Sequence, residues 1–293
     1  MTRTGLNHPN RLSSCAALAM AIAAAHPLGA QESGASGAAH PPAIEDNSFF
    51  IEEAYNQEEG VVQHISTFMR FGVPLRTSDY GFTQEWPLGS QTHQLSLTLP
   101  YSWSGAYGGT GFGDTLLNYR YQLFGHDDWA AFAPRLSLVL PTGNEESRKP
   151  GVQVNLPASR RLNARLVAHA NAGATFLPAT GTRAYNVGAS VIGLVTSKLN
   201  LMLEFASTFS SEPDERGRRT NDRETIVSPG LRYAINLGGL QIVPGLAVPF
   251  RHSGGRTSAG LFAYLSFEHP FKSSRAAEQA DAERPTKDTH GGR

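Results

Sequence analysis

Charged and amide side chains recur inside apolar stretches of this sequence, at every second position. Arg120 shares its parity with Asn118 and Gln122, and the residues that alternate with these three are leucine or tyrosine. Side chains of this kind can bind ions, pair with one another or line the path of a polar solute, provided that they share an interior. The candidate interior residues are Asn118, Arg120, Gln122, Arg135, Arg165, His169, Asn171, Asn186, Glu204, Arg232, Asn236 and Glu268.

Other arrangements in the sequence do not support catalysis or metal binding. Gly109, Gly111 and Gly113 resemble a glycine-rich phosphate loop, but no helix with an apolar stripe follows them. The ten histidines are scattered without the spacing of helical metal ligands. His252 and Ser253 are neighbours in a glycine-rich stretch, which is not the arrangement of a nucleophile and its base. We therefore predict no enzyme, no catalytic residue, no cofactor and no metal.

The elements that must position the candidate interior residues are β-strands. Leu95, Leu97 and Leu99 alternate with polar residues, and the same period of two recurs along the chain. A period of two indicates strands with one apolar face. The predicted strands are 61–70, 78–86, 92–101, 112–124, 128–140, 151–159, 162–176, 184–196, 199–210, 223–237, 240–250 and 259–271.

Prolines and aromatic residues test these strand assignments. Each proline inside a predicted strand removes one ladder donor and therefore requires a bulge or a shifted boundary. The prolines concerned are Pro100, Pro134, Pro157, Pro229, Pro244, Pro249 and Pro270. Aromatic residues near strand ends, such as Trp129 and Phe176, stand where interfacial girdles of a membrane barrel are expected, and ordinary strand-end packing is the alternative.

The predicted connections alternate between short and long. The short ones are 87–91, 125–127, 160–161, 197–198 and 238–239, and the long ones are 71–77, 102–111, 141–150, 177–183, 211–222 and 251–258. This alternation is typical of outer-membrane barrels, in which tight turns lie in the periplasm with both termini and longer loops lie outside. Strands of about ten residues also span the apolar band of about 25 Å. We predict an all-β transmembrane antiparallel up-and-down β-barrel of about twelve strands.

The two ends of the chain indicate export and flanking segments. Arg3 and Arg11 precede a small apolar run, and small residues precede a predicted cut after Ala30, which is the layout of a cleavable signal peptide. The predicted organisation is a signal peptide 1–30, a flexible leader 31–46, the barrel 47–271 and a disordered polar tail 272–293. The apolar run is too short for a membrane-spanning helix, which needs about 20 residues.

Charge and cysteine usage narrow the range of partners. The 293 residues carry 25 basic and 25 acidic side chains, so no nucleic-acid partner is predicted. Cys15 is the only cysteine and is removed with the signal peptide, which excludes a disulfide or a thiolate site from the mature chain. Cys15 also stands in a sequence that resembles a lipoprotein cleavage box, but the apolar run follows it instead of preceding it.

Alternation assigns each strand residue of a membrane barrel to one side of the wall. A charge on the lipid side near the midplane costs about 2–4 kcal/mol, so mid-strand charges are expected to face inward. Arg120, Arg135, Arg165, Glu204 and Glu268 all fall on the polar parity of their strands. Two interpretations of the interior stay open: its side chains line a solute path, or they pair with one another and fill the barrel.

An acidic segment precedes the first predicted strand. Residues 51–60 (IEEAYNQEEG) have neither a strand period nor a helical stripe. One hypothesis is that this segment enters the periplasmic mouth, meets interior arginines such as Arg120 or Arg232, and acts as a plug or gate. The carboxylates of this predicted plug are Glu52, Glu53, Glu58 and Glu59. The alternative is a solvated lead-in to the first strand.

Several stretches of the sequence resemble one family of outer-membrane proteins, the meta-pathway of phenol degradation family. The matching stretches are 47–58 (NSFFIEEAYNQE), 60–65 (GVVQHI), 111–114 (GFGD), 117–123 (LNYRYQL), 134–143 (PRLSLVLPTG) and 228–237 (SPGLRYAINL). The resemblance spans about 45–271 and implies an outer-membrane barrel that transports aromatic or other hydrophobic compounds, with no catalytic residues to carry over. The polar tail after Phe271 departs from barrels that end at a terminal aromatic residue.

The predicted function is an outer-membrane channel or transporter for small solutes, with hydrophobic or aromatic solutes as the narrower expectation. A non-conducting barrel with a structural or partner-binding role in the outer membrane is the alternative, and a soluble exported β-sandwich is a third. The expected partners are outer-membrane lipid and a small solute, and the sequence does not rank possible solutes.

Overall fold

The computed structural model describes residue 44 and the ranges 48–72, 76–104, 110–143, 149–214 and 216–270. The predicted signal peptide 1–30 and tail 272–293 lie outside the described residues, and so does the predicted leader 31–46 apart from Ile44. Among the described residues, no helix is long and apolar enough to cross a membrane.

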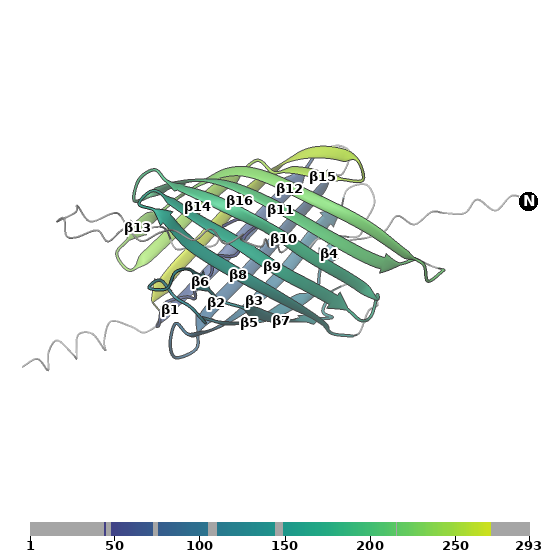
Figure 1. Cartoon of the computed structure of the whole chain (residues 1–293), viewed down its shortest axis with the longest axis horizontal. Coiled ribbons are helices and arrows are strands. Elements are labelled where there is room, and N and C mark those ends of the chain that lie inside the picture. The colour runs from purple at the N-terminus through teal and green to yellow at the C-terminus, as the bar shows by residue number, and fades with distance from the viewer. Residues whose placement is uncertain are drawn as a thin grey trace, which may run out of the picture.

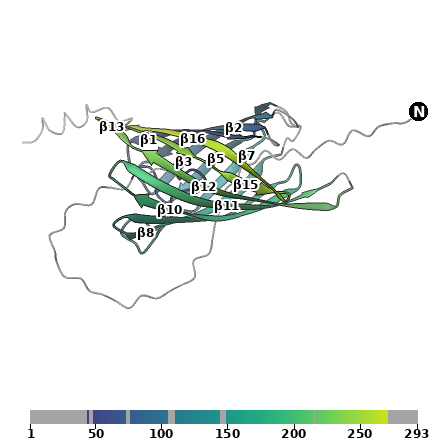
Figure 2. The same ribbon diagram turned by 90° about the horizontal axis from the view of Figure 1, so that it is seen from above.

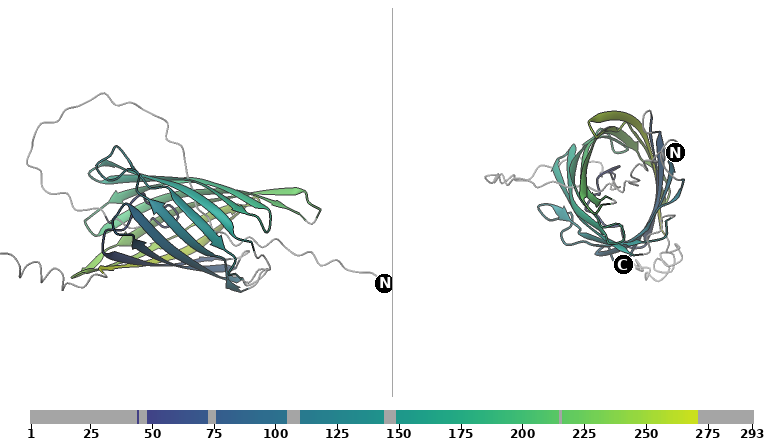
Figure 3. Two further views of the ribbon diagram at one scale, coloured as in Figure 1. Left: turned by 90° about the horizontal axis from the view of Figure 1, so that it is seen from below. Right: turned by 90° about the vertical axis from the view of Figure 1, so that its right-hand side faces the viewer.

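The described chain is a closed antiparallel β-barrel (Figure 1). Its strands are β1 (Val61–Phe71), β2 (Thr77–Pro87), β3 (His93–Ser104), β4 (Gly111–Phe112), β5 (Thr115–Tyr121), β6 (Ala131–Phe132), β7 (Arg135–Leu140), β8 (Gly151–Asn163), β9 (Leu166–Leu177), β10 (Thr182–Leu194), β11 (Leu199–Pro213), β12 (Arg219–Tyr233), β13 (Ile235–Leu237), β14 (Leu240–Ala247), β15 (Phe250–Ser253) and β16 (Arg256–Pro270). β1 pairs with β16 from Val61 to Phe71 and closes the ring seen end on in Figure 3.

The ring has twelve strand positions, although sixteen strands are labelled. Four positions are each divided between two consecutive strands: β4 and β5, β6 and β7, β12 and β13, and β14 and β15. The twelve positions form one antiparallel barrel, so the predicted fold class and strand number are confirmed.

Most of the prolines predicted within strands lie at interruptions of the ladder, whereas Pro244 lies within the continuous pairing of β14 with β16 and Pro270 ends β16. Pro134 falls in the gap between β6 and β7, and Pro249 falls in the gap between β14 and β15. Three prolines stay inside their strands: Pro100, Pro157 and Pro229. The carbonyl of each accepts a hydrogen bond from a backbone amide that lies in the gap between the two strands of the neighbouring, divided position. The strand ladder is interrupted at these points because proline has no N–H to donate.

The two faces of the barrel wall differ in chemistry. Large apolar side chains are exposed on the outer face, among them Leu136 (53%), Leu201 (51%) and Leu203 (55%). The alternate residues face inward and many are polar and buried, such as Asn118 and Arg120 on β5. An apolar surface that encircles a whole barrel is stable in lipid and not in water. The fold and this apolar belt place the chain in the outer membrane.

The external connections are shorter than predicted at two positions. The range 251–258 was predicted as a long loop, but Gly254 and Gly255 alone connect β15 to β16, with φ of 55° and 72° that suit a tight hairpin turn. Most of the predicted loop 211–222 belongs to β11 and β12, whose hairpin projects beyond the rest of the barrel (Figures 1 and 2). Both predictions are wrong because these strands continue past the apolar belt with polar outward residues.

Candidate functional site

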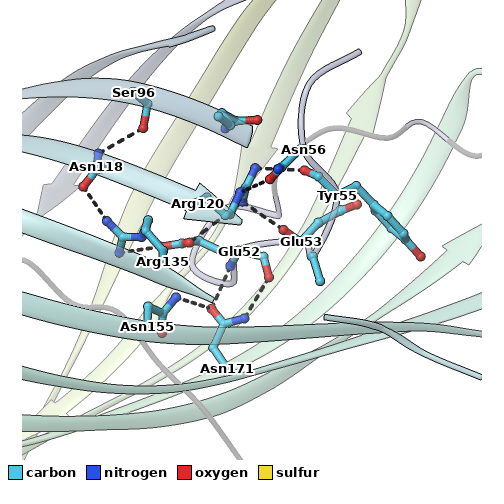
Figure 4. A network of polar contacts seen from close by, with 12 residues as sticks. Glu52, Glu53, Tyr55, Asn56, Ser96, Asn118, Arg120, Arg135, Asn155 and Asn171 are labelled. Atoms are coloured by element: carbon cyan, nitrogen blue, oxygen red, sulfur yellow. Dashed lines mark hydrogen bonds and ion pairs between the residues drawn. The ribbon is translucent and has the colours of Figure 1, made fainter. Parts of the chain in front are cut away.

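The chain segment before β1 lies inside the barrel. Residues 48–57, named the inner segment from here on, form no strand, and most of their side chains are buried. A backbone that runs through a barrel without joining a ladder must find other partners for its N–H and C=O groups. Side chains of the barrel wall supply these partners (Figure 4).

Alternate amides of the inner segment donate hydrogen bonds to the wall. The amides of Phe50, Glu52, Ala54 and Asn56 donate to Glu204 Oε1, Asn171 Oδ1, Ser159 Oγ and Gln122 Oε1, at 2.9, 2.8, 2.7 and 2.8 Å respectively. The spacing of two is that of an extended chain, which presents every second amide to the same side. The acceptors come from β11, β9, β8 and the residue after β5, so the inner segment connects strand positions that are distant in sequence.

Two amide side chains replace a neighbouring strand. Asn171 accepts from the Glu52 amide through Oδ1 and donates through Nδ2 to the Glu52 carbonyl at 2.7 Å. Gln122 accepts from the Asn56 amide and donates through Nε2 to the Ala54 carbonyl, also at 2.7 Å. A donor and acceptor pair of this kind is what an adjacent strand residue would provide in a sheet.

Arg120 on β5 binds the backbone of the inner segment. Its Nη1 donates to the Glu53 carbonyl at 3.1 Å and its Nη2 to the Tyr55 carbonyl at 2.8 Å. Its Nε donates to Asn56 Oδ1 at 2.9 Å. The rigid fork of a guanidinium suits three acceptors that lie close together. Together with Arg135, Ser159 and Asn171, Arg120 forms what is named the polar wall, which spans β5, β7, β8 and β9.

The two carboxylates of the inner segment, with Glu53 buried and Glu52 partly buried, pair with different cations. Glu52 Oε1 lies 2.6 Å from Arg135 Nη2, and Glu52 Oε2 lies 4.0 Å from Arg120 Nη1. Glu53 Oε1 lies 3.1 Å from Arg232 Nη2 and 3.7 Å from His169 Nε2. Charges buried away from water are tolerated only when they are paired and hydrogen-bonded, so each glutamate and its arginine depend on one another.

The opposite side of the lumen holds the inner segment through aromatic packing. The Phe49 ring lies 5.2 Å from the rings of both Phe262 and Tyr264 on β16. Gly230 on β12 and Gly245 on β14 make room for this ring, because a Cβ at Gly245 would lie 2.5 Å from Phe49 Cζ and a Cβ at Gly230 would lie 2.9 Å from Phe49 Cε2. These four wall residues are named the apolar wall.

Three further predicted residues face the interior. Asn118 Oδ1 accepts a hydrogen bond from Arg135 Nη1 at 2.7 Å and thereby orients that arginine. Asn186 is buried on β10 next to Gly173 on β9, where a Cβ would lie 2.5 Å from its Nδ2. Glu268 on β16 accepts from Gln63 Nε2 at 2.8 Å, at the end of the barrel where β1 begins.

Two residues predicted to line the lumen lie elsewhere. Arg165 is exposed in the turn between β8 and β9, because β8 continues to Asn163 whereas the turn was predicted at 160–161. Asn236 is exposed on β13 and accepts from Gln241 Nε2 at 3.0 Å, at the mouth of the barrel and not within it. Parity assigns a side chain to the inner or outer face only within the part of a strand that forms the barrel wall. Both of these residues lie at the end of the wall.

The four carboxylates of the predicted plug divide into two pairs. Glu52 and Glu53 lie inside the barrel with the cations described above. Glu58 and Glu59 are exposed beside the start of β1, where the carbonyl of Glu58 accepts a hydrogen bond from the Val61 amide at 3.2 Å. The segment therefore leaves the lumen before β1 begins.

Several contacts of the inner segment involve residues that sequence reasoning missed. Ser159 and Gln94 both fall on the inward parity of their strands, so parity alone could have identified them, but neither is a charge within an apolar run. Gln94 Oε1 accepts from the Gln57 amide at 2.6 Å. The role of Gly230 and Gly245 has no local signal in sequence, because it depends on where Phe49 packs.

Two cavities adjoin the inner segment. Their volumes are about 330 and 380 Å³, and both are lined by Ile44, Glu53 and Tyr55. The first extends to Trp129 and the second to Glu268, so they lie toward different parts of the barrel end where β1 begins. Each is large enough for a small solute. Within the described ranges, no group of three or more His, Cys, Asp or Glu residues is arranged to hold a metal ion.

Comparison with known proteins agrees with the barrel fold. No family model and no curated protein matches the sequence. Among solved structures, the COG4313 outer membrane channel from Pseudomonas putida F1 is similar with a TM-score of 0.51 at 11% identity, over 74% of this chain and 98% of that chain. The KdgM porin has a TM-score of 0.45 at 9% identity, over 71% of this chain and 99% of that chain. At such low identity, the likeness to the COG4313 channel shows a shared fold.

Proposed function

We propose that this chain is an outer-membrane channel or transporter for small solutes, whose path runs through the lumen past the inner segment. The observation that carries this proposal is the inner segment itself. Eight strands already suffice to enclose an interior that side chains can fill. The twelve positions of this ring enclose more space, and a peptide from outside the wall occupies it.

On this proposal the inner segment acts as a plug that limits passage. Its contacts with the wall are side-chain contacts, so it can leave the lumen without breaking any strand ladder of the barrel. Its departure would expose Arg120, Arg135 and Arg232 to water in the lumen, which hydrates a charge far better than an apolar core does. The barrel wall is thus expected to remain folded when the plug is displaced.

The narrower part of the proposal concerns the solute. The apolar wall offers aromatic surface beside the polar wall, which suits a solute with an apolar body. The resemblance to the meta-pathway of phenol degradation family supports hydrophobic or aromatic solutes, and we propose membership of that family on the matching stretches of sequence. The similar Pseudomonas putida protein is itself described as an outer membrane channel.

A specific observation favours the alternative of a non-conducting barrel. Both carboxylates and alternate amides of the inner segment have wall partners, and a network satisfied to this degree can serve as a permanent filling. In that case the outer surface, and not the lumen, would carry the function, either by partner binding or by a structural role in the membrane.

Conductance in planar bilayers distinguishes the two functions. The full-length protein is compared with a variant that lacks residues 48–57 and with Glu58→Ala, a matched change outside the lumen. We expect small or rare openings for the full-length protein and for Glu58→Ala, and a conductance at least several-fold larger for the deletion. The solute is then sought by liposome uptake of a phenol, a fatty acid and a sugar of similar size.

Heat-modifiable gel mobility keeps this test decisive, because it reports whether each variant forms the barrel. If the deletion variant is folded and yet conducts no more than the full-length protein, the plug proposal is wrong. If no folded variant conducts ions or takes up any of the three solutes, the result would instead support the non-conducting barrel. Should the deletion fail to fold, the double variant Glu52→Gln and Glu53→Gln weakens the same contacts while it keeps the chain length.

A further inference from the structure

Three arginines lie together on the outer face of the barrel at its external end. Arg183 on β10 and Arg219 and Arg223 on β12 have the outward parity of their strands, and all three are exposed. β11 lies between them, and its Ser211 pairs with Arg183 on one side and with Asn221 on the other. Because Asn221 lies midway between Arg219 and Arg223 along β12, the three side chains share one surface, which is named the arginine cluster.

The arginine cluster begins where the apolar belt ends. The guanidinium carbon of Arg223 lies 5.0 Å from the centre of the Phe209 ring, and that of Arg183 lies 6.0 Å from the centre of the Phe176 ring. Both rings are exposed on the outer face, and below Phe209 the outward residues of β11 include the exposed Leu201 and Leu203. An arginine stacked on an aromatic ring at this height keeps its stem against apolar surface and its charge in the headgroup layer.

No carboxylate neutralises the arginine cluster within the described part of the chain. None of its members takes part in an ion pair there, and Glu224 on the same strand faces inward and pairs with Arg251. The contacts of Arg219 are with neutral oxygens, the carbonyls of Gly181 at 3.3 Å and Ser211 at 3.2 Å. A guanidinium has five N–H donors, so this arginine has donors left for an anion.

The arginines with outward parity at this end are concentrated on one side of the barrel. On the opposite side, the outward residues at the external ends of β2 and β3 are aromatic, among them Tyr80, Tyr101 and Trp103. Arg70 on β1 is the one described arginine there that has the outward parity. A uniform belt of interfacial arginines would reflect general anchoring in the membrane, whereas a cluster on β10 to β12 indicates a localised ligand.

We propose that Arg183, Arg219 and Arg223 bind the phosphate groups of the outer-leaflet glycolipid, the phosphorylated lipid A part of lipopolysaccharide. Guanidinium groups bind phosphate oxygens through paired, charge-assisted hydrogen bonds. The height of the cluster is that of the headgroup layer, and the apolar belt below it provides a surface for the acyl chains. The proposal concerns the outer face of the barrel and is independent of whether the lumen conducts.

Native mass spectrometry with defined lipids tests this site. The full-length protein is titrated with lipid A that carries both phosphates and with the same lipid after phosphatase treatment. The triple variant Arg183→Gln, Arg219→Gln and Arg223→Gln is compared with Arg160→Gln, which removes an outward arginine stacked on Trp129 at the periplasmic end. A basic side chain at an anionic surface strengthens binding by about fivefold, so we expect a loss of about a hundredfold for the triple variant.

The expected pattern has four parts: one tightly bound phosphorylated lipid, weak binding of the dephosphorylated lipid, little effect of Arg160→Gln, and partial retention by the corresponding triple lysine variant. Competition by inorganic phosphate shows whether phosphate alone suffices or the whole lipid is needed; strong competition would overturn the assignment to a lipid. Equal binding of the two lipids, or a triple glutamine variant that binds like the full-length protein, would also overturn it. Heat-modifiable mobility confirms that the variants are folded.

Discussion

The polar wall and the apolar wall hold the same ten-residue segment by different physical means. On the polar wall, Arg120 and Asn171 make hydrogen bonds whose distances lie between 2.7 and 3.1 Å. On the apolar wall, Phe49 packs between two glycines and two aromatic rings. Hydrogen bonds depend on direction and specify which residue of the segment meets which residue of the wall, whereas apolar packing depends mainly on buried area.

The difference teaches how a plug can be both specific and removable. Net contributions of hydrogen bonds are modest, because water replaces the lost partners when the segment leaves. Burial of Phe49 adds free energy that depends mainly on the apolar area removed from water. Gly230 and Gly245 leave the space that the ring occupies, because a Cβ at either position would come too close to it. The polar wall thus sets the register of the inner segment, and the apolar wall supplies much of its retention.

The largest effect is expected where a buried ion pair is broken. Glu53→Ala leaves Arg232, which is 1% exposed, without its carboxylate, and the loss of one partner of a buried pair costs about 3–5 kcal/mol. Hydrogen exchange of the Ala54 amide, which donates to Ser159, should then accelerate by at least about a hundredfold. An unchanged exchange rate would mean that the ion pair between Glu53 and Arg232 does not hold the segment in the lumen.

Phe49→Ala tests the apolar wall from the side of the segment. Truncation of a buried phenylalanine costs about 3–5 kcal/mol, and water that enters the lumen is expected to reduce this toward the lower end. The exchange of the Phe50 amide, which donates to Glu204, should rise, and the rise should be nearly independent of salt concentration. The corresponding rise for Glu53→Ala should be larger at high salt concentration. Once the segment has left the lumen, water reaches Arg232, and salt ions screen its charge. Equal salt responses would contradict the distinction between ion-paired and apolar contacts of the segment.

Gly245→Ala tests the same contact from the side of the wall. The new methyl group would lie 2.5 Å from Phe49 Cζ, so the ring must shift, and overpacking of this kind costs about 1–3 kcal/mol. Conductance and exchange should change in the same direction as in Phe49→Ala but by less. In the double variant with Phe49→Ala the effect of the alanine at position 245 should vanish, because no ring remains to displace; an additive result would show that Gly245 acts elsewhere.

The sequence predicts the wall of this barrel better than its contents. Alternation alone identifies the inward side of Arg120, Arg135, Asn171 and Glu204, because lipid on the outside forbids the other choice. The same rule fails for Arg165, where the hairpin turn lies a few residues later than predicted. Strand ends are set by pairing between strands, which a single strand's pattern does not contain.

The contents of the lumen were predictable only in part. The acidic character of the segment before β1 suggested contacts with interior arginines, and Glu52 and Glu53 do meet such residues. The backbone contacts to Asn171, Ser159 and Gln122 carry no signal in the segment's own sequence, since any residue has an amide and a carbonyl. Which wall side chains meet this backbone depends on the diameter and stagger of the closed ring.

The smallest effect is expected for Glu58→Ala. This variant distinguishes the contribution of the inner segment from that of the whole acidic stretch 51–60. The Glu58 side chain is exposed, and the structure assigns only its carbonyl a contact, with the Val61 amide, which alanine retains. A surface substitution of this kind changes stability by about 0.5 kcal/mol or less. Exchange at Ala54 and conductance in bilayers should both match those of the unchanged protein. If Glu58→Ala released the segment as fully as Glu53→Ala, retention would depend on net negative charge and not on the ion pairs of the lumen. The contrast between the two glutamates therefore distinguishes docking at defined wall residues from general attraction into a basic lumen.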